Sequence, residues 1–159
     1  MDQSSPTQTL NHKLILTMSQ KVHADIERVW EILTKPKYIK QYLYGTEAIS
    51  EWKEGCSLVF KGEWEDKRYE DYGTILTFQP PNVFKYTYFS SFFELPDHPE
   101  NYSIIETRLS ANGVYVEIHL TQSGFTSEDK MNHSLTSWKH CLAIMKSIAE
   151  QPVDGNSST

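Results

Sequence analysis

Two reactive side chains are adjacent near the C-terminus, where the chain reads SLTSWKHCLAIMKSIAE over residues 134–150. His140 precedes Cys141, and His133 lies seven residues before His140. A thiol beside an imidazole suggests nucleophilic catalysis, whereas two histidines on one element suggest a metal site. The element that carries these residues decides whether either chemistry is available.

Residues 127–150 are predicted to form one long helix, because Thr126 or Ser127 can cap it and acidic residues follow in its first turn. With each residue advancing about 100° around the axis, one side of this helix is apolar. That stripe comprises Met131, Leu135, Trp138, Leu142, Met145 and Ala149. His133 and His140 fall on the opposite side, and Cys141 falls at the edge of the stripe.

This arrangement argues against chemistry on the helix. Adjacent helical residues do not face each other, so His140 cannot serve Cys141 as a base. His133 and His140 are about 10 Å apart along the axis, too far to share an ion whose ligands lie about 2 Å away. The sequence contains no HExxH, CxxC, GxSxG or glycine-rich phosphate-binding motif. We therefore expect two exposed histidines, a half-buried thiol, no catalytic residue, and no metal or cofactor.

The bulk properties bound the class of protein. The chain has 159 residues, enough for one domain around a single core, and its net charge of −6 disfavours nucleic acid and anionic membranes as partners. No apolar stretch reaches the roughly 20 residues of a membrane span, and the first ten residues lack the features of a signal peptide. With two cysteines, the protein is predicted to be cytoplasmic. We expect a domain over 11–150 between flexible tails at 1–10 and 151–159, in a monomer or homodimer.

The remaining elements are predicted from hydrophobic periodicity. Alternation predicts antiparallel strands at 13–22, 56–64, 72–78 and 83–92, followed by a hairpin over 102–122. Two short helices follow the first strand, one over 26–34 and one that begins at Pro36. Residues 65–69 are expected to form a charged turn. Strands with helices on one face predict an α+β fold, in which the long helix lies across a curved antiparallel sheet.

The last hairpin has the strongest local signal, since Asn112-Gly113 lies between two alternating runs. A turn at these two residues segregates apolar from charged side chains on opposite faces, and the charged face is expected to be exposed. The resulting register joins Leu109 to Val116, Thr107 to Ile118, Ile105 to Leu120, Arg108 to Glu117 and Glu106 to His119.

Aromatic residues make up 13% of the chain, and many fall on predicted apolar faces. A single sheet wrapped on one helix can leave a space, where buried indole and phenol groups need hydrogen-bond partners. An apolar pocket with a few such groups is typical of a small-molecule site. The candidate cavity residues are Trp30, Tyr42, Phe60, Trp64, Tyr86, Tyr88, Leu135, Trp138, Leu142 and Met145.

Four stretches share their order and spacing with a known family: ADIERVWEILTKPKYIKQYL, EWKEGCSLVFKGEW, YGTILTFQPPNVFKYTY and SLTSWKHCLAIMKSIAE. Within them, the family's motif positions are occupied by Val29-Trp30, Trp52 to Gly55, Gly73, Pro80-Pro81 and residues 138–142. On these residues the chain resembles the Hsp90-ATPase-activator-homologue-like branch of the START-like, helix-grip superfamily, over roughly residues 11–150.

The resemblance implies a sheet of six or seven antiparallel strands that grips the C-terminal helix, two short helices after the first strand, a cavity and no cofactor. Functions across the superfamily include transport of lipids or other hydrophobic ligands, polyketide cyclisation and chaperone regulation. The eukaryotic chaperone activator has a second, N-terminal domain. This chain is expected to have no room for it, so the resemblance does not extend to direct stimulation of an Hsp90 ATPase.

Three functions are consistent with these observations. The first is non-enzymatic binding of a small hydrophobic or amphipathic molecule between the sheet and the C-terminal helix. The second is co-regulation of an Hsp90-type chaperone, or another protein interaction, through an outer sheet face around Arg108, Glu117 and His119. The third is a cyclase- or hydrolase-like enzyme, which requires a titratable group inside the cavity. The inward faces are predicted to carry almost none.

Overall fold

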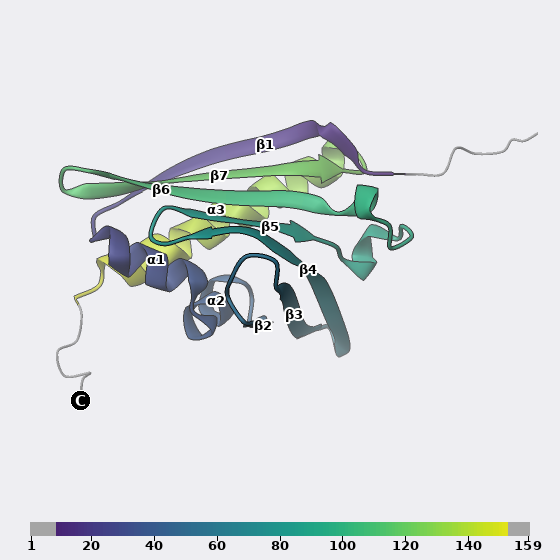
Figure 1. The fold of residues 1–159 in the computed structure, drawn as a ribbon, viewed down its shortest axis with the longest axis horizontal. Coiled ribbons are helices and arrows are strands. Elements are labelled where there is room, and N and C mark those ends of the chain that lie inside the picture. Colours follow the sequence, from purple (N-terminus) through teal and green to yellow (C-terminus); the bar gives the residue numbers. More distant parts are fainter. Residues whose placement is uncertain (1–8, 153–159) are drawn as a thin grey trace, which may run out of the picture.

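The computed structural model describes residues 9–152 (Figure 1). The strands are β1 (Asn11–Val22), β2 (Glu47–Ser50), β3 (Ser57–Trp64), β4 (Lys67–Gln79), β5 (Val83–Tyr88), β6 (Ser103–Asn112) and β7 (Tyr115–Phe125). The helices are α1 (Ile26–Thr34) and α2 (Pro36–Tyr42) after β1, and α3 (Glu128–Glu150) after β7. Two 3₁₀ turns, Ser91–Phe93 and Pro99–Asn101, lie between β5 and β6.

All seven strands belong to one antiparallel sheet, in the order β1-β7-β6-β5-β4-β3-β2. In Figure 1, α3 runs behind β5, β6 and β7, while α1 and α2 lie together at one end of the sheet. This confirms the predicted α+β, helix-grip architecture. The edge strand β2 was not predicted. It brings the sheet to seven strands, the higher of the two numbers expected.

The two halves of α3 differ in burial. Its buried residues are Cys141, Leu142, Met145 and Ala149, all in the C-terminal half. Leu142 is 1% exposed, whereas Leu135 is 36% exposed. The prediction that Leu135 faces the interior is therefore wrong, because the fully buried side of the helix begins only beyond Trp138. The predicted cap is confirmed, since the side chain of Ser127 accepts a hydrogen bond from the Lys130 amide at 3.2 Å.

The C-terminal end of α3 is fixed by Glu150. One carboxylate oxygen of Glu150 accepts a hydrogen bond from the His23 amide at 2.8 Å, and the other pairs with the Lys146 ammonium at 2.7 Å. The hydrogen bond from the His23 backbone and the contact with Lys146 together lower the pKa of Glu150 to about 2. The end of the helix is thus attached to the segment that joins β1 to α1.

The β6–β7 hairpin turns at Gly113 and Val114, one residue later than predicted. Gly113 has a φ of +69°, and Asn112 is not among the residues with positive φ. A two-residue turn that needs positive φ at its first central position favours glycine there. The actual register joins Asn112 to Tyr115, Leu109 to Ile118, Thr107 to Leu120, Arg108 to His119 and Glu106 to Thr121. This register differs from the predicted one by two residues, which leaves the apolar and charged faces as expected.

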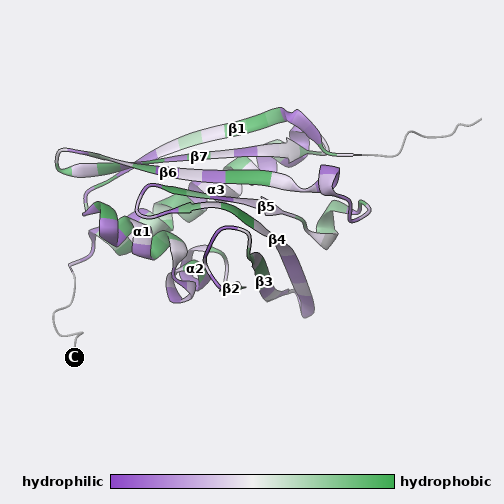
Figure 2. Ribbon diagram, in the orientation of Figure 1, coloured by the Kyte–Doolittle hydropathy of each residue, from purple (hydrophilic) through white to green (hydrophobic). Residues whose placement is uncertain are grey.

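The charged turn after β3 is shorter than predicted. Only Glu65 and Asp66 form it, with φ values of +51° and +65°, and β4 begins at Lys67. The distal ends of β3 and β4 are hydrophilic (Figure 2). Because β4 extends over residues 67–71 as well, its inner face continues from Ile75 through Gly73 to Asp71 and Tyr69.

The boundary of the N-terminal tail also differs from the prediction. Leu10, assigned to the tail, is 5% exposed, and its amide donates to Asn101 Oδ1 at 3.1 Å. Residues 9, 151 and 152 of the predicted tails are exposed, and residues 1–8 and 153–159 lie outside the described residues. Among the described helices, none has the length and hydrophobicity needed to cross a membrane.

Two substitutions on α3 test the division of this helix. Leu142→Ala should lower the free energy of unfolding by about 2–5 kcal/mol, since it removes a fully buried side chain. Leu135→Ala, the same change on the exposed half, should alter it by less than about 0.5 kcal/mol. Urea denaturation followed by circular dichroism measures both, and equal losses would contradict the division.

Candidate ligand cavity

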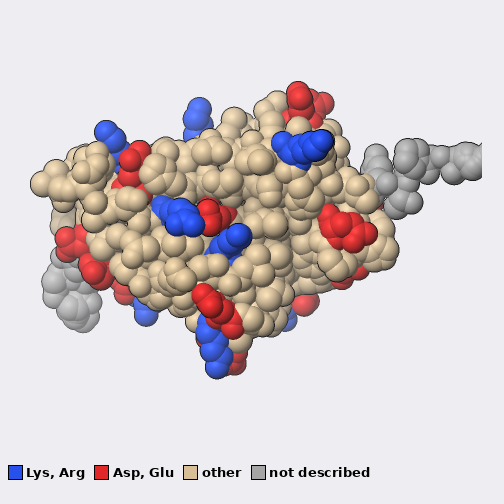
Figure 3. Space-filling view, turned by 45° about the horizontal axis from the view of Figure 1, so that its top comes forward, with Lys and Arg blue, Asp and Glu red and all other residues tan. Residues whose placement is uncertain are grey.

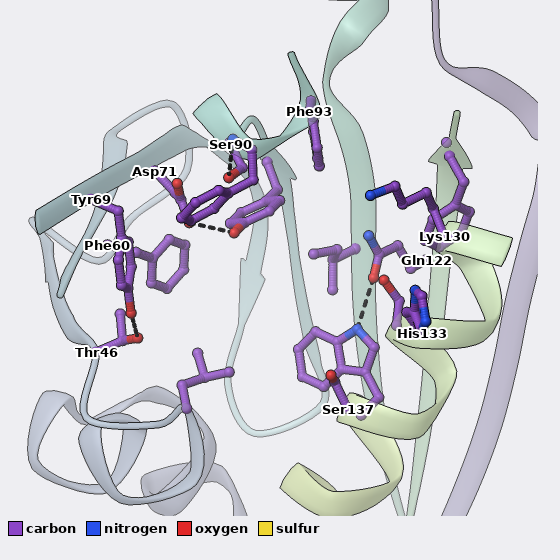
Figure 4. Close-up of a pocket in the computed structure, with 18 of the residues that line it drawn as sticks. Thr46, Phe60, Tyr69, Asp71, Ser90, Phe93, Gln122, Lys130, His133 and Ser137 are labelled. Carbon is purple, nitrogen blue, oxygen red and sulfur yellow. Dashed lines mark hydrogen bonds between the residues drawn. The ribbon is translucent and has the colours of Figure 1, made fainter. Parts of the chain in front are cut away.

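A cavity of about 740 Å³ lies between the sheet and the first half of α3. Its walls come from β3 to β7, the 3₁₀ turn after β5, and residues 130–138 of α3 (Figure 4). The first half of the helix has no buried residue, so it borders this space without filling it. The volume falls within the roughly 300–1,000 Å³ typical of small-molecule sites.

Aromatic rings form the wall on the side of the sheet. Phe60 on β3 contacts Tyr86 and Tyr88 on β5, with ring centroids 5.8 and 5.9 Å apart. Tyr88 also contacts Phe93 in an edge-to-face arrangement at 6.0 Å. At one end, the Tyr69 and Thr46 hydroxyls lie within hydrogen-bond distance of each other at 2.6 Å. These contacts fix the rings and leave their remaining surfaces toward the cavity.

A carboxyl group lies within this aromatic wall. Asp71 on β4 is 4% exposed, and its Oδ2 accepts a 2.5 Å hydrogen bond from the Tyr88 hydroxyl (Figure 4). Its Oδ1 is buried and has no hydrogen-bond partner among the described residues. Burial raises the pKa of the Asp71 carboxyl, against the opposing effects of Tyr88 and the Ser90 hydroxyl. The wall of the cavity therefore contains one buried acceptor oxygen to which no described residue donates a hydrogen bond.

Trp138 and Gln122 form a second polar feature on the side of α3. The Trp138 indole Nε1 donates to Gln122 Oε1 at 2.8 Å (Figure 4). Gln122 is 5% exposed, and its side-chain Nε2 has no hydrogen bond within the described part of the chain. The Tyr86 hydroxyl is likewise unpaired within that part, and burial raises the pKa of Tyr86. A ligand can thus meet donors as well as an acceptor.

The rim of the cavity is polar and aromatic. Lys130 and His133 border it from α3, and the exposed rings of Tyr44 and Phe92 border it from the loops. Tyr44 stacks on His140, with centroids 5.9 Å apart and an interplanar angle of 10°. The rim offers wide access from solvent, since all five of these side chains are exposed.

His140 and Cys141 lie in different environments. His133 and His140 are exposed, as expected, but Cys141 is 1% exposed and not half-buried. Its burial follows from packing of the helix edge against Tyr42 and Tyr86, and it raises the pKa of the Cys141 thiol to about 11. Within residues 9–152, no group of three or more potential ligands could hold a metal ion.

The predicted cavity residues divide into distinct groups. Phe60, Tyr86, Tyr88 and Trp138 line the cavity. Tyr42, Leu142 and Met145 belong to the filled core, where the Tyr42 hydroxyl donates to the Leu33 carbonyl at 2.7 Å. Trp30 borders a separate surface groove with Trp52 and Phe78, and Leu135 is exposed. Trp64 ends β3, but its side chain lies outside what the structure describes.

Two central residues, Asp71 and Gln122, were missed by the sequence analysis. Both lie on the inner faces of strands, and the alternation of apolar and polar residues along those strands could have predicted this position. Gln122 follows Ile118 and Leu120 on β7, and Asp71 precedes Gly73 and Ile75 on β4. Asp71 was missed because the predicted strand began only at residue 72, after a charged turn.

Comparison with known proteins identifies the family. The sequence model described as activator of Hsp90 ATPase homolog 1-like protein matches residues 23–150. The chain belongs to this family. The match includes α1, α2 and α3 and six of the seven strands, so it covers the walls of the cavity. No curated protein matches the sequence.

Solved structures share the fold. ChR145 from Cytophaga hutchinsonii is 40% identical, with a TM-score of 0.76 over 94% of this chain and 99% of that chain. The Aha1 dimer from Colwellia psychrerythraea is 15% identical, with a TM-score of 0.68 over 86% of this chain and 96% of that chain. CalU16 from Micromonospora echinospora is 21% identical, with a TM-score of 0.67 over 86% and 76% of the respective chains.

Asp71 makes stability depend on pH in a defined direction. Because its pKa is raised in the folded protein, the protein loses stability as pH rises from the ordinary value of 3.8 through the folded-state pKa. Asp71→Asn removes this loss, so it should raise the melting temperature at neutral pH. The difference should disappear in acid.

Differential scanning calorimetry across pH measures this effect. Glu70→Gln, on the exposed face of the same strand, removes the same charge without the burial and should show no such pH-dependent gain. A variant Asp71→Asn that is no more stable than the wild type at neutral pH would contradict the prediction.

The two cysteines should differ in reactivity. With a pKa of about 11, roughly one Cys141 thiol in a thousand is ionised at pH 8, and the side chain is buried. Cys56 is partly exposed. Ellman's reagent should therefore modify one thiol in the native protein and a second after denaturation. Rapid modification of both native thiols would show that Cys141 is accessible.

Proposed function

We propose that the chain binds a small amphipathic molecule in the cavity between the sheet and the first half of α3. The observation that carries this proposal is the combination of aromatic walls with a buried carboxylate oxygen that no described residue pairs. Native proteins pair most buried polar groups, and exceptions often mark sites completed by another molecule. Asp71 Oδ1 is such an atom within the described part of the chain.

The two alternatives differ in support. Asp71 meets the condition for a cyclase- or hydrolase-like enzyme, because it is an inward carboxyl with a raised pKa. The outer face has less to favour a charged docking site: Arg108 pairs with Glu106 at 3.2 Å, and His119 lies 3.6 Å from Glu117. Figure 3 shows acidic and basic side chains dispersed in this view without a continuous field of one sign. The cytoplasmic location of the protein and its state as a monomer or homodimer remain predictions.

Binding can be tested with phenylnaphthylamine, an uncharged fluorescent probe of apolar sites. The wild-type protein should enhance its emission with saturable binding. Ser134→Trp places a large ring at a position that lines the cavity and should weaken binding at least tenfold. Thr136→Trp, on the exposed side of the same helix, should leave affinity within about twofold. Absence of binding to the wild type, or equal affinity in the two variants, would refute the proposal.

A further inference from the structure

We propose that the ligand is a hydrophobic amine, bound with its ammonium group on the free oxygen of Asp71 and its apolar body against the aromatic wall. This inference rests on the proposed function, because it assigns a chemical class to the occupant of the same cavity. Three features of the structure carry it: the unpaired oxygen, the distribution of charge around it, and the rings beside it.

Asp71 Oδ1 can accept a hydrogen bond from a donor outside the chain. Tyr88 already donates to Asp71 Oδ2, and Oδ1 has no partner among the described residues. With 4% of Asp71 exposed, bulk water reaches the carboxyl poorly. A buried acceptor without a donor destabilises the folded state, so a ligand that supplies an N–H group gains affinity here.

The charges around Asp71 favour a cationic donor. The basic side chains among the described cavity residues are Lys130 and His133, both on α3, and Figure 4 shows them across the cavity from Asp71. No ion pair joins either of them to Asp71 within the described chain. Glu63, the other acidic residue of the lining, pairs with Arg68 near the hairpin end. An ammonium ion would neutralise the isolated carboxylate, which a neutral alcohol cannot do.

Aromatic faces next to Asp71 suit the same group. Phe60 is the direct partner of Asp71 across the β3–β4 pair, and Tyr88 is held to its carboxylate. An ammonium at Oδ1 would therefore lie beside two rings, whose negative faces attract cations. The apolar body of the ligand would continue along Tyr86 toward Trp138, within the 740 Å³ available.

A matched series of three naphthalene compounds separates charge from shape: naphthylethylamine, naphthylethanol and ethylnaphthalene. Binding is measured at neutral pH by titration calorimetry, with quenching of tryptophan emission as a second readout. For the wild type, we expect the amine to bind at least tenfold more tightly than either neutral compound. An amine no tighter than ethylnaphthalene, or an alcohol as tight as the amine, would overturn the proposal.

Variants then assign the preference to Asp71. Asp71→Asn should abolish the advantage of the amine while leaving affinity for ethylnaphthalene within about threefold. Glu70→Gln removes one negative charge from the outer face of the same strand and should keep the advantage. An amine preference that survives in Asp71→Asn, or is lost in Glu70→Gln, would contradict the assignment.

The outcomes distinguish the two proposals. If ethylnaphthalene and phenylnaphthylamine bind but the amine has no advantage, the amine inference fails and the binding function stands. If none of these compounds binds the wild-type protein, the proposed function fails and the inference fails with it. The wild-type series needs no substitution, so the test remains decisive even if Asp71→Asn does not fold.

Discussion

The hydrogen bond from the Trp138 indole to the Gln122 carboxamide is the contact on which the cavity depends. It joins α3 to β7 at the point where the helix passes from exposed to buried. Beyond Trp138, Leu142 and Met145 enter the main core; before it, the helix has no buried residue, and Met131 packs at the edge of a smaller cluster on β1 and β7. Because the indole N–H has a partner on the sheet, the ring can stand at the cavity wall without an unpaired buried donor.

In the opposite wall, Asp71 Oδ1 on β4 has no hydrogen-bond partner among the described residues. Burying a carboxylate oxygen without a donor reduces stability, and the hydrogen bond that Asp71 accepts from Tyr88 offsets only part of this loss. Asp71 Oδ1 therefore departs from the usual pairing of buried polar groups on the inner face of β4. Sites that depart from the rules of stable packing are frequently functional. One wall of the cavity thus has a buried indole N–H that is hydrogen-bonded within the protein, and the other has a buried carboxylate oxygen that no described residue pairs.

Much of the fold could be predicted because its periodicities are strong. Alternation over β6 and β7 identified the apolar face even though the register was wrong by two residues, since such a shift preserves the faces. The depth of burial could not be predicted. Leu135 and Leu142 lie on the same stripe of α3, and only the contact of the helix with the curved sheet makes one exposed and the other buried. The same alternation places Asp71 on the inner face of β4, but the charged residues 65–68 favour a turn, so the predicted strand begins too late.

The attachment of Glu150 has a kinetic consequence. Its carboxylate fixes the end of α3 to His23 and Lys146, whereas residues 128–137 contribute no fully buried side chain. Local opening of such a segment requires less free energy than global unfolding. Movement of this wall of the cavity is then governed by the loosely held end of the helix, and it can change while the melting temperature stays the same.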